Sequence, residues 1–164
     1  MSTPPLHDEA AGSSGPPPFD LELGKSVALS VLIHRTRRIA LIATAFIAYR
    51  KGFSFLLHQV QRHPPRRPAA GEHRRGFRPG YSWEHNLSVT GNDGHGLEVE
   101  GDEVAGGTLG WMSERYFVLG LPPPGRITIS LDWPGRRSLR VSAHVDSSGV
   151  LAAAVEAEPL WPEG

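Results

Sequence analysis

The stretch that decides the fold runs from Leu121 to Val145 and reads LPPPGRITISLDWPGRRSLRVSAHV. Apolar and polar residues alternate along it, which is the pattern of strands with one buried and one solvent-exposed face. The Pro134-Gly135 pair predicts a turn between two such strands. The stretch therefore predicts an antiparallel hairpin. Its inward residues are Ile127, Ile129, Leu131 and Trp133 on the first strand, and Leu139, Val141, Ala143 and Val145 on the second.

Short apolar runs separated by turn residues recur through most of the remaining chain, at intervals of about ten residues. They predict strands at 27–33, 39–48, 53–60, 83–90 and 111–121, and at most a short strand at 97–99. The segment 148–158 fits either a short helix capped by Ser147 or Ser148, or a further strand. The predicted fold is all-β: an antiparallel β-sandwich of about seven strands, immunoglobulin-like or related, with at most one short C-terminal helix.

The segment Ile39–Ala48 is apolar on both faces, with Ile39, Leu41 and Ile47 opposite Ile42 and Phe46. It is too short to span a bilayer, which needs about 20 residues in a helix. A short buried helix and a strand buried on both faces both fit this length, and the β-branched content favours the strand.

Composition divides the chain into a tail and one domain. Residues 1–19 are rich in Pro, Gly, Ser and Ala and predict a disordered tail, whereas 20–164 predict a single domain with a long basic loop at 61–80. No secretory signal pattern is present, and the chain has no cysteine. We therefore expect a cytoplasmic protein without membrane association, disulfides or thiolate chemistry.

The formal net charge is zero, but the charges are unevenly distributed along the sequence. From His34 to Arg78 there are eleven Lys or Arg residues and the single acid Glu72, whereas Glu84 to Glu114 contains seven acids and no base. These segments form either solvated faces of opposite sign or a dipolar surface that orients a partner or a second copy.

Several sequence features resemble a group of short actinobacterial proteins that carry no known activity. They are an aromatic-rich strand at 111–121 followed by LPPPG, a strand ending in Trp133-Pro134, and a closing Leu160-Trp161-Pro162. The stretch AYRKGFSF at 48–55 is similar to a turn of the same group. The resemblance implies a small β-sandwich and no particular chemistry.

The histidines and acids do not follow the spacing of known metal sites. His58, His63, His73 and His85 lack the short paired spacing of zinc ligands, and the acids Glu98, Glu100, Asp102 and Glu103 lack the order of a calcium-binding EF-hand loop. The sequence also contains no nucleophile elbow, phosphate-binding loop or His-Glu-x-x-His motif. We therefore predict no metal and no cofactor, and we assign no catalytic residues. A hydrolase whose site is assembled from scattered residues stays a third alternative, for which the sequence nominates no residues.

The leading hypothesis is a non-catalytic interaction or structural module that binds a protein partner or a second copy of itself. The alternative is binding of a polyanion or single-stranded nucleic acid, because arginines contact phosphates and aromatic rings stack on bases. The candidate residues for this alternative follow the third predicted strand: Arg62, Arg66, Arg67, Arg74, Arg75, Phe77, Arg78 and Tyr81. A neutral net charge argues against non-specific nucleic-acid binding by the whole surface.

Overall fold

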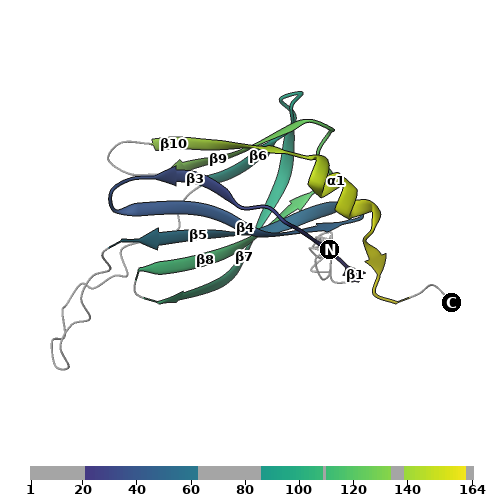
Figure 1. Cartoon of the computed structure of the whole chain (residues 1–164), viewed down its shortest axis with the longest axis horizontal. Coiled ribbons are helices and arrows are strands. Elements are labelled where there is room, and N and C mark those ends of the chain that lie inside the picture. Colours follow the sequence, from purple (N-terminus) through teal and green to yellow (C-terminus); the bar gives the residue numbers. More distant parts are fainter. Residues whose placement is uncertain (1–20, 63–85, 109, 134–138, 162–164) are drawn as a thin grey trace, which may run out of the picture.

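The computed structural model describes residues 21–62, 86–108, 110–133 and 139–161, without the side chains of 102–108, 133 and 139. The predicted tail at 1–19 and nearly all of the predicted loop at 61–80 lie outside these ranges. Within them the chain is all-β and antiparallel with one short C-terminal helix, as the sequence predicts (Figure 1). The elements in chain order are β1 (Glu22–Leu23), β2 (Lys25–Val27), β3 (Val31–Arg35), β4 (Ile39–Tyr49), β5 (Gly52–Gln61), β6 (Asn86–Thr90), β7 (Gly96–Thr108), β8 (Trp111–Leu119), β9 (Arg126–Trp133), β10 (Leu139–Asp146), α1 (Ser148–Val155) and β11 (Glu158–Pro159).

The hairpin that decides the fold is formed by β9 and β10, with Ile127 opposite Val145 and Leu131 opposite Val141. Ile127, Ile129 and Leu131 are buried, which confirms the predicted inward row; the side chain of Trp133 lies outside the described residues. Ser130, predicted on the exposed row, is only 7% exposed. It lies on β9, which is paired on both sides, with Ser88 of β6 and Ser142 of β10 opposite it.

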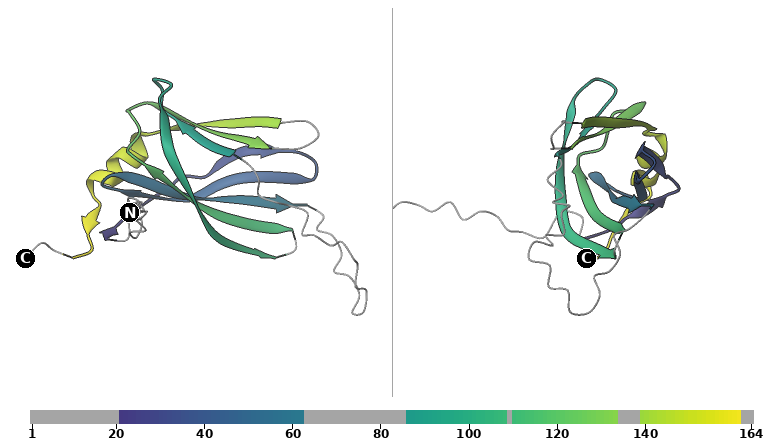
Figure 2. Two further views of the ribbon diagram at one scale, coloured as in Figure 1. Left: turned by 180° about the vertical axis from the view of Figure 1, so that it is seen from behind. Right: turned by 90° about the vertical axis from the view of Figure 1, so that its left-hand side faces the viewer.

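Nine strands form one sheet that curls into a half-barrel (Figure 2). Eight of them follow the order β10-β9-β6-β7-β8-β5-β4-β2, and the ninth, β3, pairs with β4. A further ribbon is formed by β1 and β11. The first predicted strand, 27–33, is wrong as one element, because the chain leaves the strand conformation at 28–30 between β2 and β3. The two layers of the predicted sandwich are thus joined into one sheet by a strand that belongs to both.

That shared strand is β7, and its length is the main error of the sequence-based prediction. It spans 13 residues instead of the three predicted. At its start Leu97 pairs with Val89 of β6, and from Glu98 onward it pairs with β8. Leu97 and Val99 are half-buried while Glu98 and Glu100 are exposed. Pairing with β8 therefore outweighs the low strand propensity of its glycines and acids.

The strand β4 contains a bulge that reverses the predicted facing of its second half. The register with β5 shifts between Thr44 and Ile47, and Ala45 has a φ of 52°. Because the bulge inserts an extra residue, Phe46 lies on the same buried face as Leu41, and Ile47 lies outward with Ile42. The predicted placement of Ile47 with Leu41, and of Phe46 with Ile42, is therefore wrong.

The core fills the interior of the half-barrel and centres on stacked aromatic rings. The ring centroid of Phe55 lies 5.2 Å from that of Phe46, 6.4 Å from that of Phe53 and 5.8 Å from that of Tyr116. Val89, Ile127 and Ile129 close the core from the other layer, and Val150 and Ala154 of α1 cover one end.

The segment 148–158, for which the sequence allows a helix or a strand, contains the helix α1. Ser147 links the start of this helix to the triple-proline segment before β9. The Ser147 Oγ donates to the Pro123 carbonyl at 3.0 Å and accepts from the Gly125 N–H at 2.9 Å. Ser147 occupies the N-cap position, but its hydroxyl makes no capping bond. Asp146 instead accepts from the Ser148 N–H at 2.7 Å. Hydrogen bonds from Ser148 hold the pKa of this carboxyl below its usual value.

Candidate functional site

Of the arginines predicted to bind polyanions, Arg62 lies within the described residues. It is exposed at the end of β5. The other predicted site residues lie outside the described ranges: Arg66, Arg67, Arg74, Arg75, Phe77, Arg78 and Tyr81.

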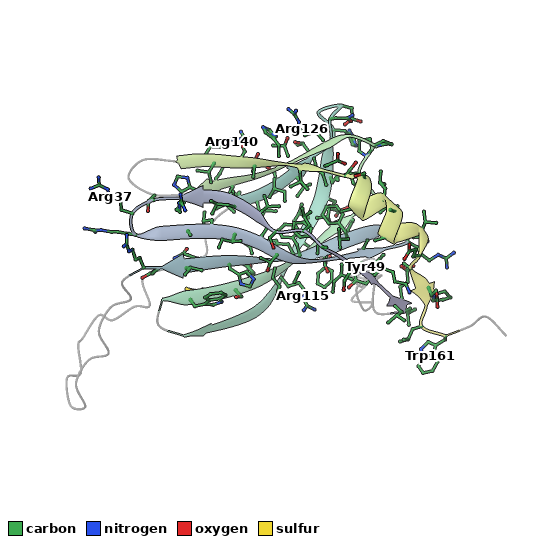
Figure 3. All side chains as sticks on the ribbon, viewed as in Figure 1. Arg37, Tyr49, Arg115, Arg126, Arg140 and Trp161 are labelled. Carbon is green, nitrogen blue, oxygen red and sulfur yellow. The ribbon has the colours of Figure 1, made fainter. Side chains whose placement is uncertain are left out.

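The structure brings Arg62 to a second group of arginines that the sequence places in a polar turn. The Arg62 N–H donates to the Arg38 carbonyl at 2.8 Å, which continues the β4–β5 pairing beyond Ile39 and Gln61 at the open end of this hairpin, beside the β3–β4 turn. Arg35 and Arg37 belong to the same turn region, and all of these side chains are exposed. Figure 3 shows Arg37 projecting from this end of the molecule. We call Arg35, Arg37, Arg38 and Arg62 the arginine end.

Within the described part of the chain, none of these guanidinium groups forms an ion pair. The exposed acids of β7 lie away from them. Glu98 pairs opposite Leu119 at the end of β8 that lies beside Gly52, whereas Arg62 follows the other end of β5. The charge asymmetry of the sequence is thus also a separation in space among the described residues.

An exposed tryptophan lies beside the arginine end. Cross-strand pairing places Arg35 opposite Ala40, Ala40 opposite Val60, and Val60 opposite Trp111. Directly paired residues share a face of a sheet, so Arg35 and Trp111 lie on the same face, which is the outer one. Trp111 is 46% exposed.

The Trp111 ring is held in place by a hydrogen-bonded group in the next cross-strand row. Its Nε1–H donates to Ser113 Oγ at 2.9 Å, and its ring centroid lies 5.2 Å from that of His58. The His58 Nδ1 lies 2.6 Å from the same Ser113 oxygen, and its Nε2 lies 2.7 Å from Thr44 Oγ1. Both imidazole nitrogens are therefore engaged by hydroxyl groups, which fixes the ring that supports Trp111.

Burial lowers the pKa of His58 below its ordinary value of 6.5, so the ring is neutral at pH 7. As the pH decreases below about 6.5, His58 binds a proton in the unfolded chain before it does so in the folded one. The free energy of unfolding therefore decreases as the pH decreases, until the pH passes the folded-state pKa of His58. We expect the free energy of unfolding, measured with urea, to show this decrease between about pH 7.5 and about pH 5. The variant His58→Gln should lack it, and an unchanged pH dependence in the variant would contradict this assignment.

Besides His58, a pair of titratable groups, Glu114 and Tyr116, lies on the inner face of β8. The Tyr116 hydroxyl donates to Glu114 Oε2 at 2.7 Å, and Gly101 of the neighbouring strand leaves space for both side chains. Burial raises the pKa of Glu114, and burial together with this carboxylate raises the pKa of Tyr116. The hydrogen bond from Tyr116 stabilises the ionised carboxylate and so opposes the effect of burial on the pKa of Glu114.

Large apolar side chains are exposed around β1, β11 and the end of α1. These elements lie at the opposite end of the molecule from the β3–β4 turn (Figure 1). The Leu160 N–H donates to the Leu21 carbonyl at 2.7 Å. We call this group of side chains the apolar end. Its members and exposed fractions are Leu21 at 61%, Leu23 at 54%, Val155 at 87%, Leu160 at 46% and Trp161 at 71%.

Of the histidines and acids considered as metal ligands in the sequence, some lie within the described residues and others lie outside them. His58 holds Trp111, whereas His63, His73 and His85 lie outside the described ranges. Glu98 and Glu100 are exposed on β7, and the side chains of Asp102 and Glu103 are outside the description. Within the described residues no three metal-ligating side chains gather, and no helix there is long and apolar enough to cross a membrane.

Comparison of the sequence with known proteins yields no match among family models and none among curated proteins.

Proposed function

We propose that this protein is a non-catalytic interaction module that associates with a second copy of itself through the apolar end. The observation that carries the proposal is the exposure of Leu21, Leu23, Leu160 and Trp161 on and beside one small ribbon. Contiguous exposed apolar groups of this kind mark interaction sites in soluble proteins. The cytoplasmic location predicted from the cysteine-free sequence belongs to the same proposal.

The charges of the apolar end favour a second copy as the occupant. Lys25 Nζ lies 3.9 Å from Glu158 Oε1, and Glu22 Oε2 accepts from the Arg50 N–H at 2.8 Å. One pair of opposite charges beside the ribbon, Lys25 and Glu158, is therefore matched within each chain, which lessens the like-charge repulsion between two copies. The chain as a whole has a net charge of zero, which removes long-range repulsion between copies.

The geometry also suits a twofold arrangement. The ribbon consists of two strands, β1 and β11, and among the described residues each has one edge without a strand partner. An unpaired edge can accept the same edge of another copy, and a twofold interface uses identical patches on both sides.

Leu23→Ser is expected to weaken self-association by about tenfold or more, because the change removes a buried leucine from both copies. Sedimentation velocity over a range of protein concentrations measures the dissociation constant. The matched control is Leu32→Ser, since Leu32 is 51% exposed but lies on β3. A wild-type chain that stays monomeric at every concentration, or equal effects of the two variants, would contradict the proposal.

A second candidate function is polyanion binding through the arginine end, favoured by the exposure of Arg35, Arg37, Arg38 and Arg62 without ion pairs among the described residues. Retention on a heparin column at low salt, lost when Arg38 and Arg62 are both replaced by alanine, tests this function. Elution of the wild-type chain in the void at low salt would exclude it.

A further inference from the structure

The arginine end and Trp111 together have a chemistry more specific than a positive patch. Guanidinium groups bind the phosphates of any nucleic acid, so arginines by themselves do not distinguish single strands from duplexes. An exposed aromatic ring beside the same groups adds a surface on which an unpaired base can stack.

The outer face of the sheet presents both kinds of group on one side. Arg35 and Trp111 lie in one cross-strand row, and Arg62 lies two residues beyond Val60, so the strand alternation returns it to that side. The row from β3 to β8 crosses three strand spacings, or about 14 Å. A single strand laid across it can therefore contact arginines at one end and the indole at the other.

Trp111 is also prepared for stacking. Its indole N–H is bound to Ser113, and its ring packs beside that of His58, yet 46% of the residue remains exposed. A ring already fixed in place loses little conformational entropy when a ligand binds. In the described part of the chain, the residues between Arg35 and Trp111 in this row are Ala40 and Val60, which are short and uncharged.

We propose that the outer face of β3, β4, β5 and β8 at the arginine end binds single-stranded nucleic acid. Trp111 stacks on a base, and Arg35, Arg38 and Arg62 contact phosphates. This inference rests on the second candidate function, polyanion binding, and names its ligand class and its stacking residue. It is independent of self-association at the apolar end.

The test is fluorescence anisotropy of the full chain with a labelled oligothymidine of about 15 nucleotides, titrated at several salt concentrations. Replacing Arg35, Arg38 and Arg62 together by alanine is expected to lower the affinity at least tenfold and to reduce the salt slope by about 2. Trp111→Leu is expected to lower the affinity about tenfold while leaving the salt slope unchanged. Trp111→Phe should restore part of the loss, since it keeps an aromatic ring.

The controls are Arg126→Ala and Trp161→Leu, which change an exposed arginine and an exposed tryptophan far from this face (Figure 3). Both should bind like the wild-type chain, and losses equal to those of the site variants would overturn the proposal. Equal binding of heparin, duplex and single strand, with no effect of Trp111→Leu, would overturn the stacking site and leave polyanion binding standing. Failure to bind any of the three polyanions at low salt would overturn both.

Discussion

Replacement of Phe55 by alanine is expected to reduce the free energy of unfolding by about 3–5 kcal/mol. Phe55 is 1% exposed, and its ring contacts Phe46, Phe53 and Tyr116 at once. Truncation removes these contacts and leaves a cavity among rings carried by three strands, which cannot all move inward to fill it. Urea or thermal unfolding measures the change, and a loss of this size is a large part of the stability of a small domain.

The control for this variant is Phe117→Ala. Phe117 lies on β8 opposite Ser54, on the outer face of the same sheet, and is half-buried. Its truncation opens toward solvent, so the expected loss is smaller than that of Phe55→Ala. Equal losses from the two variants would show that the aromatic cluster is not the centre of the core.

Ser147→Ala is expected to destabilise the protein by about 1–3 kcal/mol, although the change removes one oxygen atom. Ser147 is fully buried, and its hydroxyl bonds both the Pro123 carbonyl and the Gly125 N–H. Alanine leaves these two groups without their partner and releases the link that enters β9 from the start of α1. Thermal unfolding of the variant measures the loss.

The neighbouring Ser148→Ala provides a matched control. Ser148 and Asp146 are both exposed, and alanine keeps the backbone N–H that Asp146 accepts while it removes the side-chain hydrogen bond from Ser148 to the same carboxyl. Its effect should stay within about 0.5 kcal/mol. If Ser148→Ala costs as much as Ser147→Ala, helix capping rather than the tie to the proline link stabilises this corner.

The parts of the fold that sequence predicts correctly are those in which local pattern and packing agree. In β9 the alternation of Ile127, Ile129 and Leu131 with polar residues is uninterrupted, and the structure buries the apolar row. In β4 the alternation is interrupted by the bulge at Ala45, and alanine gives no local signal for a positive φ. Every residue of β4 after the bulge therefore lies on the face opposite to the predicted one, and no local feature of the sequence indicates this change.

The length of β7 could not be predicted for a different reason. Its glycines and acids have low strand propensity, and the favourable pairing comes from β8, which follows it in the chain. Propensity over a short window does not include that partner. The strand therefore extends well beyond the half-buried pair Leu97 and Val99, on which a periodicity argument depends.

Counting register from the sequence locates the arginine end to within one residue. The tight turn at 49–52 pairs Tyr49 with Gly52, and an uninterrupted register from there would pair Arg38 with His63 instead of placing it beside Arg62. The bulge shifts the count by one residue, which is the size of error that a sequence argument cannot detect. The contact of Trp111 with His58 depends in addition on the non-local pairing of β5 with β8, which no local signal provides.

The strand shared between the two layers also has a consequence for how the chain folds. The hairpins β4–β5, β7–β8 and β9–β10 join strands adjacent in sequence, and these can form early because little loop-closure entropy is lost. The pairings of β5 with β8 and of β6 with β9 join distant segments. Because β7 is covalently continuous between the layers, neither layer can complete its edge while the other is unformed. We therefore expect the slow step of folding to be the docking of hairpins around β7, and the two layers to form and unfold as a single cooperative unit.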